Sequence, residues 1–269
     1  MIYILTVVLG LAIGSFLNVC IYRIPRDVSI ASPRRSYCPY CKHRLSALDN
    51  VPVLSYIFLR GKCRYCKGPI SPRYAIVEIL TAGLLFVMVH RSLGLHQDVR
   101  YIALEIATTC IFTALLIVIA FIDLELSIIP DIISYSGLIV GLLLAISAAV
   151  LHSNVGLLIS RVLGAVIGAG IIILIAVAGK AVFRKEAMGG GDIKLMAMIG
   201  IYLGWWPHIP ITLISASLFG SIIGVVLIIA SRKKMESRIP FGPFLAVGAL
   251  LSLLYGEALW TWYSNLMGL

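Results

Sequence analysis

The stretch Tyr101–Asp123 reads YIALEIATTCIFTALLIVIAFID. It is almost wholly apolar over about 20 residues, the length of helix that crosses the hydrocarbon core of a bilayer, and it ends on an ionisable carboxyl group. Across the 269-residue chain, 60% of residues are hydrophobic and 13% are charged, with a mean hydropathy of +1.02. A soluble domain has roughly 25% charged residues. The stretch therefore predicts a transmembrane helix of an all-α integral membrane protein.

Similar apolar runs recur along the chain and predict about eight transmembrane helices. The first run lacks the positively charged start and the small-residue cleavage site of a signal peptide, so we expect it to be a retained span. The predicted spans are Ile2–Tyr22, Tyr74–His90, Tyr101–Ile122, Ile128–Leu151, Val155–Val182, Ile193–Trp206, Ile211–Ala230 and Phe241–Tyr263. Glycines inside the later runs are expected to let helices pack closely; they are Gly137, Gly141, Gly164, Gly168, Gly170, Gly220 and Gly224.

The basic residues predict the orientation of the chain, because Lys and Arg accumulate in cytoplasmic loops. If the amino terminus lies outside, 19 of the 22 basic residues fall in the inside segments Arg23–Arg73, Lys180–Lys194 and Arg232–Arg238. The net charge of +10 then follows from topology, and no nucleic-acid partner is needed to explain it.

The only substantial polar segment lies between the first two predicted spans. We therefore expect three regions along the chain. They are a first transmembrane helix at residues 1–22, a small cytoplasmic domain at residues 23–73, and a transmembrane bundle at residues 74–269.

Four of the six cysteines form two CxxC motifs in this polar segment. Cys38 and Cys41 are separated from Cys63 and Cys66 by 21 residues, a spacing close to that of four-cysteine zinc ribbons. Four thiolates complete the tetrahedral shell of Zn²⁺, so the predicted site is structural and its metal would fold the loop. The alternatives are disulfides or redox-active CxxC motifs, which a reducing cytoplasm disfavours. The adjacent His43 is surplus to such a site, and Cys20 and Cys110 are interpreted as core packing.

With the predicted orientation, Asp123 and Asp192 fall at the same, cytoplasmic face. Asp123 ends the third predicted span and Asp192 precedes the sixth. An ionisable group at membrane depth is costly unless it is paired, protonated or hydrated, and so it indicates a functional site. Two neighbouring carboxyl groups can share one proton, so that one draws a proton from water while the other polarises a carbonyl group. This is the chemistry of aspartic proteases.

Residue chemistry alone leaves three hypotheses open: an aspartic protease, ion or proton translocation, and structural pairing of an aspartate with Lys194. The glycines at 189–191 would permit unusual backbone conformations and close approach of a substrate, although a glycine run often marks only a helix start.

Other acidic residues compete for a role. Asp131 is expected to be a helix N-cap, Glu125 flanks the same loop, Glu78 and Glu105 lie within spans, Glu186 is expected to be solvated, and Glu257 has no assigned role.

Several motifs together resemble the type IV prepilin peptidases. These are bifunctional leader peptidases and N-methyltransferases of pilus, type II secretion and competence systems, and belong to the GxGD-type intramembrane aspartic proteases. The resemblance covers nearly the whole chain. It is carried by GSFLNVC at 14–20 with RIP at 23–25, the two CxxC motifs, NVPVLS at 50–55, RY at 73–74 with VE at 77–78, FID at 121–123 with IPD at 129–131, residues 188–194, and PFGP at 240–243.

The resemblance implies that Asp123 and Asp192 are the catalytic pair. The implied substrate is a prepilin or pseudopilin, whose short basic leader ends in Gly and is cut at the cytoplasmic face of the bacterial inner membrane, before a hydrophobic helix. It also implies methylation of the new terminal amine from S-adenosylmethionine. The chain has no glycine fingerprint of a βαβ dinucleotide site, so methyl-donor residues stay unassigned, with Gly61 and Lys62 as a candidate.

A proton- or ion-coupled transporter that uses the same carboxylate pair is the alternative from another class. Transporters usually carry internal repeats and broken helices near the bilayer midplane. Neither pattern is evident in this sequence, and both aspartates fall at one interface.

Overall fold

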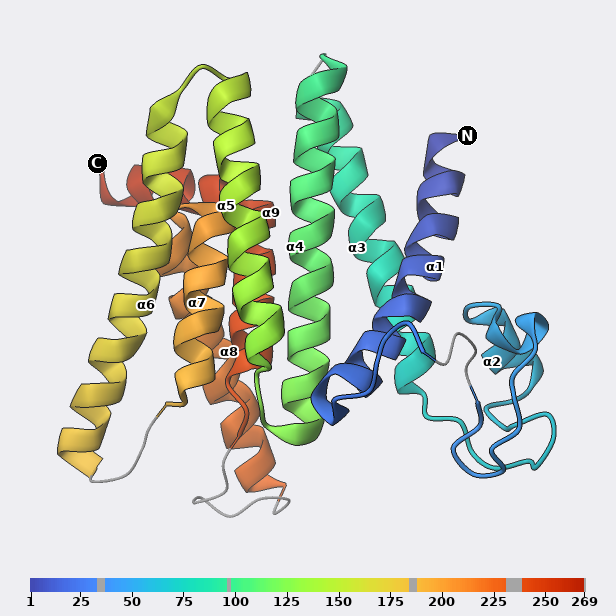
Figure 1. Ribbon diagram of the computed structural model, residues 1–269. Coiled ribbons are helices and arrows are strands. Elements are labelled where there is room, and N and C mark those ends of the chain that lie inside the picture. The colour runs from blue at the N-terminus through green and yellow to red at the C-terminus, as the bar shows by residue number, and fades with distance from the viewer. Residues whose placement is uncertain (33–36, 96–97, 184–187, 231–238, 269) are drawn as a thin grey trace. The chain divides into compact units, whose positions relative to one another are not determined.

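The computed structural model describes residues 1–32, 37–95, 98–183, 188–230 and 239–268. Within these ranges the regular elements are helices (Figure 1), which confirms the all-α prediction. In chain order they are α1 (Ile2–Arg23), η1 (Ile24–Arg26), η2 (Ala47–Asn50), α2 (Leu54–Phe58), α3 (Arg73–Leu95), α4 (Val99–Leu126), α5 (Asp131–Leu151), α6 (Val155–Phe183), α7 (Gly190–Leu203), α8 (His208–Ile229) and α9 (Gly242–Met267), where η denotes a 3-10 helix.

Seven helices in the described ranges are long and apolar enough to cross a membrane: α1, α3, α4, α5, α6, α8 and α9. The sixth predicted span, Ile193–Trp206, corresponds to α7, which has 14 residues. At 1.5 Å per residue that is about 21 Å, less than the roughly 30 Å of hydrocarbon in a bilayer. Its side chains are enclosed by protein instead, since Leu195, Met196 and Ile199 are fully buried.

The chain forms two compact units, Met1–Val118 and Ile119–Leu269. In the first unit α1 packs along α3. The contact is close because Gly10 and Gly14 face α3: a Cβ on either glycine would lie 2.6 Å from a backbone atom of Ala82 or Glu78. Two glycines four residues apart are a common means of bringing membrane helices together. One turn further along α1, the Asn18 side-chain amide donates to the Tyr74 carbonyl (3.0 Å).

The second unit is built around α7, which packs against α5, α6, α8 and α9. Two of the glycines that were predicted to serve packing do so here. Gly164 of α6 lies directly against Gly200 of α7, and a Cβ on Gly164 would be 2.5 Å from the Gly200 carbonyl oxygen. A Cβ on Gly141 of α5 would lie 2.6 Å from Ile201. The short helix is therefore held by backbone-to-backbone contact on one side and by side chains on another.

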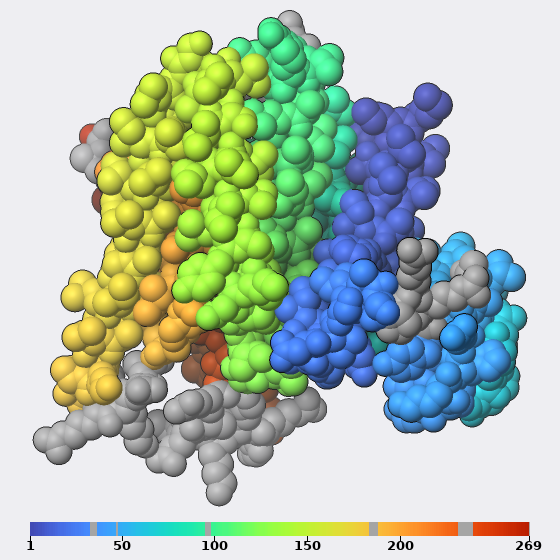
Figure 2. Space-filling model, in the orientation of Figure 1, coloured from blue at the N-terminus to red at the C-terminus, as the bar shows by residue number. Residues whose placement is uncertain are grey.

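Between α1 and α3 the chain forms a lobe that holds η2, α2 and the four cysteines. In Figure 2 the lobe (blue to cyan) stands beside the lower end of α1. The predicted orientation counted basic residues at 34–35, 184–185 and 232–238, which lie outside the described residues. The orientation therefore remains a prediction.

Candidate active site and metal-binding loop

Asp123 lies near the end of α4 with its side chain turned into the second unit, where the residue is 5% exposed. Its Oδ2 accepts a hydrogen bond from the backbone N–H of Gly242, the first residue of α9 (3.0 Å). The N-terminus of a helix carries partial positive charge and free N–H groups, which stabilise a carboxylate. Gly242 is needed for this approach, because a Cβ there would lie 2.6 Å from the same oxygen.

Asp192 is in the first turn of α7 and is 9% exposed. Its Oδ2 accepts from the backbone N–H of Gly189, the N-cap residue (3.2 Å). The glycine run thus marks a helix start, and none of its three residues has a positive φ. The expectation of unusual backbone conformations there was wrong. Gly191 is needed here because it has no side chain: a Cβ at this position would lie 2.9 Å from Ile129.

The structure brings these two predicted site residues together. Ile129, in the connection between α4 and α5, contacts the starts of both α7 and α9: it faces Gly191, and its Cδ1 would lie 3.3 Å from a Cβ on Gly242. The ends of four helices therefore surround a pair of carboxyl groups that are both about nine-tenths buried.

A second acidic residue of the same region has a structural role. Asp131 is the first residue of α5, and the N-cap is Pro130, so the prediction that Asp131 is the N-cap was wrong. Its Oδ1 instead pairs with the Lys194 ammonium of α7 (2.6 Å), which also lies 5.1 Å from the Tyr135 ring. Lys194 thus pairs with Asp131 and ties the start of α5 to the helix that carries Asp192.

The remaining acidic candidates lie elsewhere. Glu125 is exposed and Glu105 is half-buried in α4. Glu257 is exposed on α9, 3.7 Å from the His208 imidazole. Glu186 lies outside the described residues.

The four predicted cysteine ligands converge. The Sγ atoms of Cys38, Cys41, Cys63 and Cys66 all lie within 4.8 Å of one another, and Cys38 Sγ is 3.8 Å from Cys66 Sγ. A tetrahedral metal with metal–sulfur bonds of about 2.3 Å holds its sulfurs about 3.8 Å apart. All six cysteines are in the described ranges and none forms a disulfide. The cluster of four thiols therefore suggests metal binding, and Cys20 is buried elsewhere in α1.

The two CxxC motifs have the same backbone turn. The carbonyl of the first cysteine accepts from the N–H four residues later: Lys42 N–H donates to Cys38 (2.9 Å), and Lys67 N–H donates to Cys63 (3.0 Å). Both lysines have a positive φ, of 58° and 60°. Each turn is closed by an isolated antiparallel bridge, Tyr37 with Arg44 and Lys62 with Pro69. Two copies of one turn thus present two thiols each to a common point.

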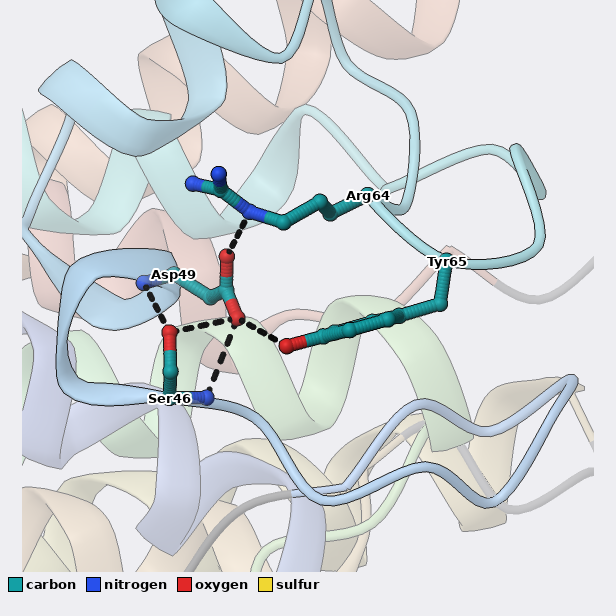
Figure 3. A network of polar contacts seen from close by, with 4 residues as sticks. All are labelled: Ser46, Asp49, Arg64 and Tyr65. Atoms are coloured by element: carbon teal, nitrogen blue, oxygen red, sulfur yellow. Dashed lines mark hydrogen bonds and ion pairs between the residues drawn. The ribbon is translucent and has the colours of Figure 1, made fainter.

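Asp49 ties the two halves of the lobe together (Figure 3). Its carboxylate accepts from the Ser46 hydroxyl (2.8 Å), the Ser46 N–H (3.0 Å), the Arg64 Nε–H (2.6 Å) and the Tyr65 hydroxyl (3.3 Å). Burial alone would raise the pKa of Asp49, but the hydrogen bonds from Ser46 and the charge of Arg64 outweigh it and lower the pKa to about 2. Sequence reasoning missed this residue, because its partners are up to 16 positions away.

Glu78 joins the lobe to α3. The residue is 7% exposed, and its Oε2 accepts from the Val53 N–H (2.7 Å), just before α2 begins. Val53 has φ 59° and ψ −49°, a conformation that is rare and strained for a β-branched residue. The buried carboxyl group therefore holds a strained point of the loop against the membrane helix.

The fold and these sites define a multi-pass helical membrane protein with a buried carboxyl pair and a four-cysteine metal-binding loop. Residues 8–92 match the Bacterial Peptidase A24 N-terminal domain, and residues 110–225 match the Type IV leader peptidase family. The chain therefore belongs to the type IV prepilin leader peptidase/N-methyltransferase family.

Individual relatives agree with this assignment. A protein of Aeromonas hydrophila named prepilin leader peptidase/N-methyltransferase is 35% identical, over 94% of this chain and 91% of its own. Proteins of the same name from Pseudomonas putida and Legionella pneumophila are 33% and 31% identical, over 98% and 97% of this chain and 94% of each relative. No solved structure gives a significant match.

Proposed function

We propose that the chain is a membrane-embedded aspartic endopeptidase that removes the basic leader of type IV prepilins or pseudopilins, and that it also N-methylates the new terminal residue. The observation that carries the peptidase half is that Asp123 and Asp192 are held on either side of Ile129, where the ends of α4, α7 and α9 converge. The family name of the relatives supports both halves.

In the proposed cleavage, the pair holds one proton. The ionised carboxylate takes a proton from a water molecule, and the protonated partner donates a hydrogen bond to the carbonyl oxygen of the scissile bond. The hydroxide attacks the carbonyl carbon, the C–N bond of the tetrahedral intermediate breaks, and the leaving amine takes a proton from the pair. No metal takes part in these steps.

Buried carboxyl groups suit this reaction because a site with little water strengthens their effect on developing charge. Two backbone N–H groups, of Gly242 and Gly189, hold one oxygen of each aspartate. In the proposed mechanism the other oxygen of each aspartate faces the substrate or the water. The transporter alternative gains no support from this geometry, because both carboxyl groups lie at helix ends rather than midway along a span.

The substrate fits a protease that is itself in the membrane. A prepilin presents a hydrophobic helix preceded by a short basic leader ending in Gly. We propose that the helix enters beside the bundle, and that the leader is cut at the cytoplasmic face, with the amino terminus of the enzyme outside. The excess of Lys and Arg in the segments placed inside supports that orientation.

For the metal-binding loop we propose structural zinc, held by Cys38, Cys41, Cys63 and Cys66. Four thiolates favour zinc and leave no open position for catalysis. Methyl transfer would use S-adenosylmethionine, whose sulfonium methyl passes to the free amine created by cleavage.

The test is one incubation with two readouts. Purified enzyme in detergent is mixed with a prepilin that contains a Gly-Phe junction and with labelled S-adenosylmethionine. We expect the leader to be lost on a gel and label to appear only on the cut product. Label on uncut prepilin, or a cut elsewhere than after Gly, would contradict the proposal.

A further inference from the structure

The cysteine lobe carries an exposed apolar face that the proposed chemistry does not use. Leu54, Ile57 and Phe58 of α2 are 52%, 60% and 81% exposed, and they lie on one side of the helix at positions i, i+3 and i+4. Leu48 of the adjoining η2 is 71% exposed. Four large apolar side chains in water are unfavourable, and a contiguous exposed apolar patch usually marks a contact surface.

The segment that carries this face is strongly basic. Residues 23–73 contain 11 basic and two acidic residues. Arg60 and Lys62 follow α2 directly and are exposed. One of the two acidic residues, Asp49, is already neutralised by Arg64. Even if four thiolates around a divalent metal contribute two negative charges, the lobe stays strongly positive.

The lobe is also held at the membrane by both of its ends. It begins at the end of α1 and finishes at the start of α3, and both helices are long and apolar enough to span the bilayer. The Val53 N–H, directly before α2, donates to Glu78 in the second turn of α3 (2.7 Å), so α2 begins beside the end of a spanning helix. The first turns of a spanning helix lie near the boundary between headgroups and hydrocarbon, so this hydrogen bond keeps α2 close to that boundary.

We propose that α2 with Leu48 is an interfacial membrane anchor that inserts Leu54, Ile57 and Phe58 among the acyl chains while Arg60 and Lys62 bind anionic lipid headgroups. A short apolar helix flanked by basic residues has the composition of elements that lie in the membrane interface. The anionic surface is the partner because it matches both the apolar face and the charge beside it. The proposal does not depend on the peptidase or methyltransferase activity.

The experiment uses the full-length protein with p-benzoylphenylalanine in place of Phe58, reconstituted in vesicles of phosphatidylglycerol and phosphatidylcholine. After irradiation, mass spectrometry identifies what is joined to residue 58. The control carries the same group in place of Tyr40, an aromatic residue of the first CxxC turn that is 64% exposed. We expect lipid adducts at position 58 to exceed those at position 40 about tenfold, since only α2 reaches the acyl chains.

Charge is tested with Arg60→Gln/Lys62→Gln in the same protein. Adducts at position 58 should fall about tenfold in vesicles with phosphatidylglycerol and change little in phosphatidylcholine alone. Equal lipid adducts at positions 58 and 40 would overturn the proposal. Adducts to a prepilin or to a second copy of the chain, without lipid, would also overturn it.

A measurement on the unmodified protein guards against a misfolded variant. Backbone hydrogen exchange of residues 54–60 should be several-fold slower in nanodiscs that contain phosphatidylglycerol than in nanodiscs of phosphatidylcholine alone. Identical exchange rates of residues 54–60 in the two kinds of nanodisc would show that anionic headgroups do not bind this segment.

Discussion

Gly242 is the residue whose smallness matters most to the carboxyl pair. Its N–H holds Asp123 Oδ2 at 3.0 Å, and its missing Cβ leaves room for that oxygen and for Ile129. The sequence around Gly242 does not predict this hydrogen bond, because it joins residues that are 119 positions apart. The same is true of the two distant partners of Asp49, Arg64 and Tyr65, which belong to the second CxxC motif.

Gly242→Ala should lower cleavage of a prepilin by about 100-fold, because a displaced catalytic group costs about that much per ångström. The added Cβ would meet Asp123 Oδ2 at 2.6 Å, so the carboxylate must move. Initial rates in detergent measure the effect. Gly220→Ala is the control, since its Cβ would make an ordinary 3.4 Å contact with Phe244. Similar rates for the two variants would show that Asp123 is not positioned by the start of α9.

Asp49→Asn should lower the free energy of unfolding of the cysteine lobe by about 2 kcal/mol at pH 7, because the hydrogen bonds that are lost are made to a charged group. The folded pKa of about 2 is below the ordinary 3.8, so the contribution is present above about pH 4 and fades as the pH falls toward 2. Hydrogen exchange at the Lys42 and Lys67 amides measures it. The exposed Asp27 provides the control variant Asp27→Asn, and equal effects of both would contradict this role.

At the scale of helices, the apolar runs located the spanning elements because their length and composition depend on the bilayer and not on neighbours. Two features of the helices were not predicted from the sequence. The run Ile193–Trp206 became the enclosed helix α7, since composition alone does not distinguish a side chain that faces lipid from one that faces protein. The packing of Gly10 and Gly14 against α3 also went unpredicted, although their spacing of four residues is a known signal. The cysteine cluster was predictable because CxxC spacing itself encodes the turn.

Gly164→Ala should destabilise the second unit by about 1 to 3 kcal/mol, the usual cost of overpacking. Its Cβ would meet the Gly200 carbonyl oxygen at 2.5 Å, between α6 and α7. Gly170→Ala on the same helix meets nothing within 4 Å, so it should be neutral or stabilise by up to about 1 kcal/mol through helix propensity. Thermal unfolding in detergent compares the two, and equal melting temperatures would show that α6 and α7 are not in close contact.

At the scale of the whole molecule, the two sites belong to different units. The carboxyl pair is in the unit Ile119–Leu269, and the metal-binding loop is in the unit Met1–Val118. The hydrogen bonds at Asp123 and Asp192 come from residues of their own unit. Cleavage is therefore expected to tolerate changes in the loop better than methyl transfer does.

Removal of the metal with a chelator, or Cys38→Ser with Cys63→Ser, should reduce methylation and loop order more than leader cleavage. The metal supplies folding free energy to the loop, whereas the hydrogen bonds that hold Asp123 and Asp192 come from residues of their own unit. Parallel assays of cut product and methyl label give the ratio. Cys20→Ser, away from the cluster, should leave the ratio unchanged. An equal loss of both activities in a well-folded variant would contradict this separation.

We propose above that Asp123 and Asp192 act as one catalytic pair. The most direct measurement is the rate of prepilin cleavage by Asp123→Asn, Asp192→Asn and the double variant, with Glu125→Ala as the control. We expect each single change to cost about 10³-fold or more, the double change to cost no more than either, because members of one catalytic unit are not additive, and Glu125→Ala to keep substantial activity. Cleavage by either single variant near the unmodified rate, with the protein folded, would contradict the claim.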